Sequence, residues 1–221
     1  MRPWPARLHD GEVTLRPLRY SDQAAWRSAR ERNVTWLAPW DATAPPGAVS
    51  RPATFRQLVR RLHGLARDGS AYPFAIDVSG AFAGQVTVNN IVRGSAQFGS
   101  VGYWLDREYA GRGVMPRAVA LVIDHCFFTA RLHRIEIAIR PENSNSLRVV
   151  EKLGLHEVGF APNFLHIDGA WRDHRIYAIT KEEVPDGVLT RLRASGNAAT
   201  NPASNPAANP ATNPAAKPEP Q

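Results

Sequence analysis

Residues 103–115 read YWLDREYAGRGVM, and they carry the strongest structural signal in the chain. An alternating strand leads into a short Gly-x-Gly loop, and the loop opens directly into a long helix with apolar periodicity. The first N–H groups of a helix have no partner within that helix, and glycine lets a ligand approach the backbone closely. The sequence therefore predicts a pyrophosphate-binding site at this junction.

The Gly-x-Gly loop has competing interpretations. A Walker loop ends in Gly-Lys-Ser/Thr, which the sequence does not contain. A dinucleotide-binding loop reads G-x-G-x-x-G, but Pro116 stands here in the place of the third glycine. The strand before such a loop also belongs to a repeated βαβ unit, whereas this strand follows three others. The remaining alternative is a glycine turn that binds no ligand.

The composition is that of a soluble globular protein, with 43% hydrophobic and 21% charged residues among 221. No run of about 18 apolar residues is present, so we expect no membrane span and a cytoplasmic protein. The single cysteine, Cys126, excludes an intramolecular disulfide, and the histidines show no ligand spacing, so we predict no metal site. The net charge of +7 fits either an RNA-rich partner or an arginine-rich proteome.

The C-terminal segment differs in kind from the rest of the chain. Asn-Pro-Ala recurs at Asn201, Asn205, Asn209 and Asn213, and no large apolar residue follows Ala194. Each proline removes a backbone donor and biases the preceding residue away from helix. We therefore expect a folded domain over residues 1–193 and a disordered tail over residues 194–221.

The pattern before the tail predicts a mixed α/β domain. Alternation and turn residues place strands at 12–19, 72–78, 84–92, 99–105, 134–139, 157–167 and 171–179, with Asp168-Gly169 turning between the last two. Helices are predicted for 22–32, capped by Ser21 and Asp22, and for 54–67, 114–131 and 144–153. Residues 36–40, with Trp36 and Trp40 around a proline, are expected to form a loop.

The junction resembles the acyl-CoA motif of the GCN5-related N-acetyltransferase (GNAT) family, Arg/Gln-x-x-Gly-x-Gly/Ala. The motif corresponds here to Glu108-Tyr109-Ala110-Gly111-Arg112-Gly113. Both glycines match, while Glu108 departs from the leading Arg/Gln. Because backbone amides form most of a phosphate cradle, we expect CoA binding in spite of this departure.

A second segment strengthens the resemblance. Residues 134–155 are similar to the family's N-x-x-S … K-x-G-F segment, with Asn143 at the asparagine that contacts the cofactor and Leu155 in place of the usual Phe. Taken alone, Asn143 and Ser144 are equally consistent with a helix cap. Residues 36–40, 88–94 and 165–174 narrow the resemblance, over residues 10–182, to RimJ-type ribosomal-protein-alanine N-acetyltransferases.

The resemblance implies a fold, a cosubstrate and a binding site. We expect the α/β (α+β) GNAT fold, with a mixed central sheet of about seven strands, a splayed parallel pair and about four flanking helices. Acetyl-CoA is the expected cosubstrate. The residues predicted to bind it are Tyr103, Trp104, Leu105, Ala110, Gly111, Arg112, Gly113, Val114, Met115, Asn143 and Ser146.

The family transfers the acetyl group directly from the thioester to an amine, and three residues are candidates for this chemistry. By resemblance, Ser146 lies near the sulfur and protonates the thiolate; a first-turn helix serine is the alternative. The glutamate of RimL-type relatives corresponds to Leu165, so the base is sought elsewhere. Glu136 is a candidate base if its side chain faces the groove. Asn89 is expected to orient a water or the incoming amine. Our hypothesis is that a water molecule relays the proton from the amine.

The implied acceptor is a protein N-terminus, namely the N-terminal alanine of a ribosomal protein. An α-amine, with a pKa of about 7.7–8.0, demands little of a base. The predicted substrate-binding residues are Trp36, Trp40, Asn89 and Tyr103. The alternatives are a small amine, such as a polyamine or an antibiotic, and a weakly catalytic acyl-CoA-binding protein in ribosome assembly. Indirect ribosome association and either a monomer or a homodimer fit the leading hypothesis.

Overall fold

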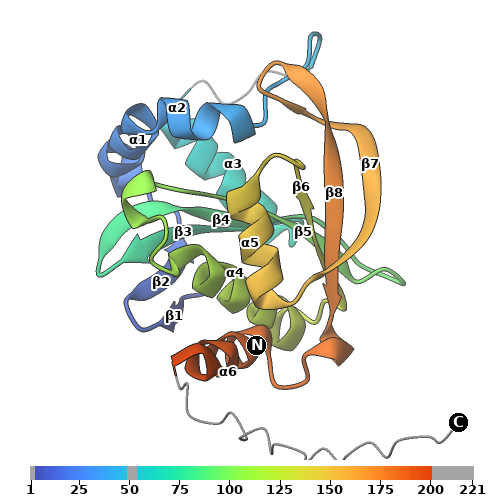
Figure 1. Cartoon of the computed structure of the whole chain (residues 1–221). Coiled ribbons are helices and arrows are strands. Elements are labelled where there is room, and N and C mark those ends of the chain that lie inside the picture. The colour runs from blue at the N-terminus through green and yellow to red at the C-terminus, as the bar shows by residue number, and fades with distance from the viewer. Residues whose placement is uncertain (1–2, 49–53, 201–221) are drawn as a thin grey trace, which may run out of the picture.

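The computed structural model describes residues 3–48 and 54–200, with side chains described up to Ser195. Its eight strands form one sheet in the order β1-β2-β3-β4-β5-β6-β8-β7 (Figure 1). Every neighbouring pair is antiparallel except β5 and β6, which run parallel. The predicted mixed sheet is therefore confirmed. It has one strand more than expected, because β1 (Leu8–Asp10) is too short to show an alternation.

The remaining strands are β2 (Val13–Pro17), β3 (Tyr72–Val78), β4 (Ala81–Val92), β5 (Phe98–Leu105), β6 (Arg134–Ile139), β7 (His156–Ile167) and β8 (Ala170–Thr180). The α-helices are α1 (Gln23–Arg32), α2 (Val34–Leu37), α3 (Phe55–Arg67), α4 (Val114–Asp124), α5 (Ser144–Leu153) and α6 (Val188–Thr200). Short 3₁₀ turns lie at Tyr20–Asp22, Ala38–Trp40, Arg107–Tyr109 and Lys181–Glu183. Within the described ranges, no helix is both long and apolar enough to cross a bilayer.

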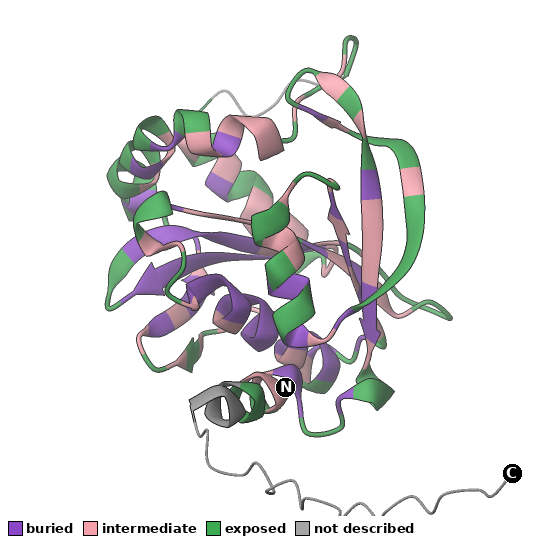
Figure 2. Ribbon diagram, in the orientation of Figure 1, coloured by how far each residue is buried: buried purple, intermediate pink, exposed green. Residues whose placement is uncertain are grey.

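Helices cover both faces of the sheet and create two hydrophobic clusters. The larger cluster joins α4 and α5 to one face, where Val86, Ile135 and Phe127 are fully buried. The smaller cluster joins α1 and α3 to the opposite face through Ala29 and Val59. Buried residues accordingly concentrate in the central strands and in α4 (Figure 2). Strand β3 is buried along its whole length because both of its faces are covered.

Local signals explain two of the helices. Thr54 and Gln57 form a capping box at the start of α3, with both hydrogen bonds at 3.2 Å. Asn143 caps α5, because the Ser146 N–H donates to Asn143 Oδ1 at 3.1 Å. Gly154 ends α5 in the left-handed conformation. The predicted limits of α5 are therefore confirmed.

Three local predictions are wrong. Residues 36–40 form the end of α2 and a 3₁₀ turn, because Pro39 stands in the first turn, where its missing N–H needs no partner. The Asp22 side chain does not cap α1; it accepts hydrogen bonds from Arg16 and from the Arg19 N–H. The helix predicted for 114–131 is α-helical only to Asp124 and continues as a π-helical turn, His125–Thr129.

Helix α6 (Val188–Thr200) was not predicted, and its first N–H groups are satisfied by a side chain from a distant part of the chain. The N–H groups of Val188 and Leu189 donate to the Asp124 carboxylate at 2.6 and 3.1 Å. The helix runs to Thr200, so the predicted domain boundary after residue 193 falls inside it. Residues 201–221 lie outside the described residues, and the disorder of this segment stays a prediction.

The parallel strands β5 and β6 pair only at their beginnings. The register starts at Phe98↔Arg134 and ends at Ser100↔Glu136. Beyond this point β5 continues along β4 to Leu105, while β6 continues along β8. The two strands therefore diverge, which confirms the predicted splayed pair, and their facing edges are left without a partner strand.

A buried ion cluster joins β2 to β3 and to the turn before α1. Arg16 donates to the Asp22 carboxylate at 2.7 and 2.9 Å and to the Asp77 carboxylate at 2.6 and 2.9 Å. These side chains are only 9–11% exposed. The positive charge of Arg16 is therefore what makes two buried carboxylates tolerable.

Replacing Arg16 by Leu leaves both carboxylates without a counter-charge. We expect the free energy of unfolding to fall by about 3–5 kcal/mol, measured by urea denaturation at pH 7. The matched control is Arg27→Leu, since the Arg27–Glu31 pair spans 4.0 Å with side chains 67% and 70% exposed. The control should change stability by no more than about 0.5 kcal/mol. Equal losses in the two variants would contradict the role given to the cluster.

Candidate active site

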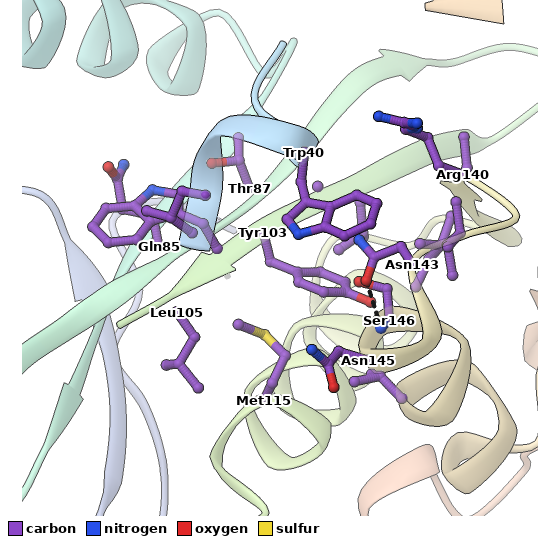
Figure 3. A pocket seen from close by; sticks show the side chains of 18 of the residues that line it. Trp40, Gln85, Thr87, Tyr103, Leu105, Met115, Arg140, Asn143, Asn145 and Ser146 are labelled. Atoms are coloured by element: carbon purple, nitrogen blue, oxygen red, sulfur yellow. Dashed lines mark hydrogen bonds between the residues drawn. The ribbon is translucent and has the colours of Figure 1, made fainter. Parts of the chain in front are cut away.

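A cleft of about 580 Å³ opens where β5 and β6 diverge (Figure 3). Alternation along β5 directs its side chains to opposite sides of the sheet. Tyr103 pairs with Val86 and shares its face with α4 and α5, which we call the α4 face. Trp104 pairs with Gln85 and shares its face with α1 and α3, which we call the α1 face. Residues of both faces line the cleft, so it passes through the sheet.

On the α4 face, the Gly-x-Gly loop presents free backbone donors. Gly111 and Gly113 have left-handed conformations, with φ of 79° and 75°, which glycine adopts without strain. Among the described residues, the N–H groups of Gly111, Arg112 and Gly113 donate to no backbone carbonyl. Gly113 is the N-cap of α4, so the next two N–H groups lie in a first helical turn and lack intrahelical partners. The loop therefore offers unpaired donors to an anion at the positive end of a helix dipole.

Helix α5 adds polar and positive groups to the same face. Asn145, Arg148 and Lys152 line the cleft with helical spacing. Asn143 and Ser146 line it as well, and the hydrogen bond between them fixes the first turn of α5 (Figure 3). The α4 face therefore offers positive charge next to the free N–H groups of the loop.

Tyr103 places a hydroxyl without a partner beside α5. Its side chain points toward Ser146 (Figure 3). In the described structure the hydroxyl oxygen is buried and makes no hydrogen bond of normal geometry. Burial raises the pKa of Tyr103 to about 12, although the nearby Ser146 side chain acts in the opposite direction. Because a buried hydroxyl without a partner is unfavourable, this arrangement favours a ligand atom as the missing partner.

On the α1 face, the lining beside the divergence is polar and uncharged. Gln85, Thr87 and Asn89 stand at alternate positions of β4, and all three line the cleft. Gln85 Oε1 accepts from Trp26 Nε1 at 2.6 Å, and Asn89 Nδ2 donates to the Thr87 carbonyl at 3.3 Å. Amide and hydroxyl groups in this position can orient a small polar substrate.

Two tryptophans of the α2 region form a wall of the cleft. Trp36 Nε1 donates to the Leu105 carbonyl at 3.3 Å, and the Arg107 guanidinium lies 5.6 Å from the ring centre. The Arg140 guanidinium lies 5.4 Å from the ring centre of Trp40. Both indoles are therefore held by cationic neighbours and present fixed apolar surfaces.

The segment after Trp40 is attached to the tip of the β7–β8 hairpin. The Thr43 N–H donates to the His166 carbonyl at 2.8 Å, and the Gly169 N–H donates to Thr43 Oγ1 at 3.0 Å. Leu165 and Ile167 of the same hairpin line the cleft. These bonds close the wall between the tryptophans and the hairpin.

The charges around the cleft are unequal. Asp41 is the one carboxylate among the described lining residues, and it is paired with Arg30. Arg148 and Lys152 supply positive charge from α5, and Arg140 adds a positive charge over the Trp40 ring. The cleft therefore suits an anionic ligand on the α4 face and offers no free carboxylate to a polycation.

The structure brings most of the predicted site residues together. Those that line the cleft are Trp36, Trp40, Asn89, Tyr103, Trp104, Leu105, Ala110, Gly111, Gly113, Val114, Met115, Asn143 and Ser146. Trp104 lines it from the α1 face, away from the Gly-x-Gly loop, so its indole is on the side opposite to the one expected for a cofactor contact.

Two predicted residues lie outside the described lining. Glu136 stands opposite Ser100, before the divergence, and its carboxylate accepts from Arg134 Nε at 2.8 Å. This position does not support Glu136 as the base. The Arg112 side chain turns to Glu12, with 3.4 Å between Nη2 and Oε2, so that only its backbone remains at the loop.

Several lining residues were missed by the sequence reasoning. Gln85 and Thr87 share the alternation of Asn89, so extending that pattern along β4 would have found them. Arg148 and Lys152 share a helical face with Asn145 and could have been found in the same way. His174 gives no local signal, because it reaches the cleft through the pairing of β8 with β6.

Comparisons with known proteins agree with this geometry. The family model of the acetyltransferase (GNAT) domain matches residues 12–156. The structure is similar to that of Mycobacterium smegmatis RimJ in complex with CoA-disulfide, with a TM-score of 0.82 and 36% identity, over 88% of this chain and 96% of that one.

Two curated relatives extend the comparison. The ribosomal protein uS5 alanine N-acetyltransferase of Escherichia coli is 29% identical over 170 residues, which cover 75% of this chain and 87% of the relative. The probable N-acetyltransferase YjcK of Bacillus subtilis is 44% identical over 96 residues, which cover 43% of this chain and 53% of that protein.

Replacing Tyr103 by Phe removes a buried hydroxyl that has no partner to lose. We expect the free energy of unfolding of the ligand-free protein to rise by about 1 kcal/mol. Tyr72→Phe is the control, because the Tyr72 hydroxyl accepts from Arg93 Nη2 at 3.2 Å and its loss should cost about 1 kcal/mol. Urea denaturation of both variants measures the difference. A clear loss of stability in Tyr103→Phe would mean that the hydroxyl is satisfied in the free protein.

Proposed function

This chain belongs to the GNAT acetyltransferase family, and we propose that it transfers the acetyl group of acetyl-CoA to a protein N-terminus, namely the N-terminal alanine of a ribosomal protein. The observation that carries the proposal is the cleft through the sheet, which connects the free N–H groups on the α4 face to a polar, aromatic-walled pocket on the α1 face. A donor and an acceptor that enter from opposite faces meet at the divergence of β5 and β6. Direct transfer between them then needs no covalent enzyme intermediate.

The relatives support both the donor and the acceptor. RimJ of Mycobacterium smegmatis was solved with CoA-disulfide, and the Escherichia coli relative is named for the alanine of ribosomal protein uS5. A ribosomal acceptor would place the reaction in the cytoplasm.

The donor occupies the α4 face. The free N–H groups of the Gly-x-Gly loop bind the pyrophosphate of acetyl-CoA, and Arg148 and Lys152 add positive charge for the phosphates. The thioester then lies at the divergence, where the facing edge of β5 supplies backbone donors for the oxyanion. A donor of this kind typically lowers the barrier by about 3 kcal/mol.

The thiolate leaves on the α4 face, beside Tyr103 and Ser146. The Tyr103 hydroxyl has no partner in the described structure, and its pKa of about 12 keeps it protonated at neutral pH. It is therefore a hydrogen-bond donor for the sulfur or for the Ser146 hydroxyl, which passes a proton to the sulfur. The cap from Asn143 holds Ser146 in the first turn of α5.

The acceptor occupies the α1 face. An α-amine has a pKa of about 7.7–8.0, so an appreciable fraction is neutral at pH 7. Asn89 and Thr87 supply polar groups beside the amine, and Trp36 and Trp40 form the wall along the following residues. A polyamine would need carboxylates for its further ammonium groups, whereas Asp41 is already paired with Arg30.

Thiol release from acetyl-CoA tests the acceptor. We expect kcat/KM for a peptide with a free N-terminal Ala to exceed that for an internal-Lys peptide with a blocked N-terminus by at least about 100-fold at pH 7. The reason is that the neutral fraction of a lysine amine is about 300-fold smaller. Spermidine should also be a poor acceptor. Thiol release with spermidine alone would overturn the N-terminal acceptor, and CoA binding without turnover of any amine would overturn the proposed reaction.

Gly113→Ala tests the anion site against a matched control, Gly80→Ala. Both glycines have left-handed backbones, with φ of 75° and 87°, and open space where a Cβ would stand. Each variant should lose about 1–2 kcal/mol of stability from backbone strain. Only Gly113→Ala should also weaken CoA binding in a calorimetric titration, by about tenfold or more, because relief of the strain turns the N–H donors away. Wild-type CoA affinity in Gly113→Ala would contradict the placement of the pyrophosphate.

A further inference from the structure

His174 is brought to the acceptor side of the cleft by strand pairing. In the β6–β8 register Ala138 pairs with Ile176, so His174, two residues earlier, shares the face of Ala138. The parallel pair Ser100↔Glu136 places that face on the same side as Asn89, which pairs with Ser100. His174 and Asn89 therefore stand on the α1 face, on either side of the divergence, and both line the cleft.

The ring of His174 is fixed in one tautomer. Nδ1 lies 2.9 Å from the Arg172 carbonyl oxygen, and because a carbonyl only accepts, Nδ1 carries the hydrogen. Nε2 then holds the free lone pair. The ring of Phe164 packs edge-on against the imidazole, with the ring centres 5.9 Å apart, and helps to hold its orientation.

His174 is only 3% exposed, and it is one of the residues that line the cleft. Nε2 makes no hydrogen bond to any described residue. The buried side-chain atoms that lack a partner in the described structure are Tyr103 Oη and Arg172 Nε. Nε2 has no partner and is not one of these fully buried atoms, so it is not completely enclosed by the protein. The open space that His174 lines is the cleft.

The surroundings keep the ring neutral. Burial lowers the pKa of His174 below its ordinary 6.5, and Arg140 lowers it further. The Arg172 carbonyl, Asp173 and Glu142 oppose this shift without cancelling it. In strand β7, Ala161 pairs with His174 and Phe164 packs against its ring, and neither residue carries a charge.

Other proton acceptors are lacking in the described lining. Its one carboxylate, Asp41, is committed to Arg30, and His174 is its one histidine. Glu136 is outside the cleft and bound to Arg134. We propose that His174 Nε2 is the general base that takes the proton from the acceptor amine, directly or through one water. This inference rests on the proposed acetyl transfer and identifies its base.

The step balances with the groups already described. The amine nitrogen forms the new C–N bond to the acetyl carbon and becomes a strongly acidic ammonium, so a base of modest strength is sufficient. Its proton moves to His174 Nε2 on the α1 face. The C–S bond then breaks, and the sulfur is protonated on the α4 face from the Tyr103–Ser146 side. His174 returns its proton to solvent, and the Tyr103–Ser146 side regains one proton from solvent, so no net proton is gained or lost.

His174→Gln tests the base, because glutamine can still donate to the Arg172 carbonyl but cannot accept a proton. We expect kcat/KM to fall by about 100-fold or more, with CoA affinity unchanged. In the wild type, log kcat/KM should decrease with decreasing pH, with a slope of two below the pKa of the ring. One unit of this slope comes from protonation of the amine and the other from protonation of His174. In His174→Gln only the slope of one from the amine should remain. Added imidazole should restore part of the rate of His174→Ala. No such restoration is expected if His174 only positions other groups.

The control is His63→Gln, a half-buried histidine outside the described lining whose Nε2 lies 2.7 Å from the Leu18 carbonyl oxygen. It should keep the wild-type rate and pH profile. Each comparison uses the amine that the wild type acetylates fastest among the Ala peptide, the Lys peptide and spermidine. Faster acetylation of spermidine than of either peptide would therefore contradict the proposed acceptor, and the comparison of His174→Gln with the wild type would still test the base. A His174→Gln rate within threefold of wild type, with an unchanged slope, would overturn the base, and a wild type inactive on all three amines would contradict both proposals.

Discussion

Strands β5 and β6 stop pairing after Ser100 and Glu136, and the rest of the site depends on that interruption. An interior strand normally has both edges hydrogen-bonded, which leaves no room for a ligand inside a sheet. Here each strand keeps one satisfied edge, because β5 continues along β4 and β6 along β8. The opening therefore removes only the backbone hydrogen bonds that would otherwise join β5 to β6. It provides a passage between the faces of the sheet, lined by unpaired backbone edges and by alternating side chains.

The sheet also separates the two kinds of proton chemistry. On the α4 face burial raises the pKa of Tyr103 to about 12, so the hydroxyl remains a donor, which the proposed reaction uses for the leaving sulfur. On the α1 face burial lowers the pKa of His174, so the imidazole remains a proton acceptor, which the proposed reaction uses for the amine. The same physical cause, removal from water, acts in opposite directions because it disfavours an anion in one case and a cation in the other. Divergent pKa values across a cleft are what an acid–base pair requires.

The elements that carry their own signals could be predicted from the sequence. Strand β6 and helix α5 were placed correctly, since the alternation and the Asn143 and Gly154 caps lie within the segments themselves. Helix α6 was missed because its N-terminal donors are satisfied by Asp124, far away along the chain. The site follows the same rule. Gly111 and Gly113 indicate the proposed anion site from the local sequence alone. The place of His174 depends on which strand lies next to β6, and the place of Glu136 before the divergence follows only from the β5–β6 register.

The central claim is that donor and acceptor meet through the sheet at the divergence of β5 and β6. A crystal structure with a bisubstrate analogue, in which CoA is joined through an acetyl linker to the nitrogen of an Ala peptide, tests it most directly. The account predicts the pyrophosphate on the N–H groups of the Gly-x-Gly loop, the sulfur beside Tyr103 and Ser146 on the α4 face, and the peptide nitrogen beside His174 on the α1 face. An analogue whose CoA and peptide parts both lie on one face of the sheet would contradict it.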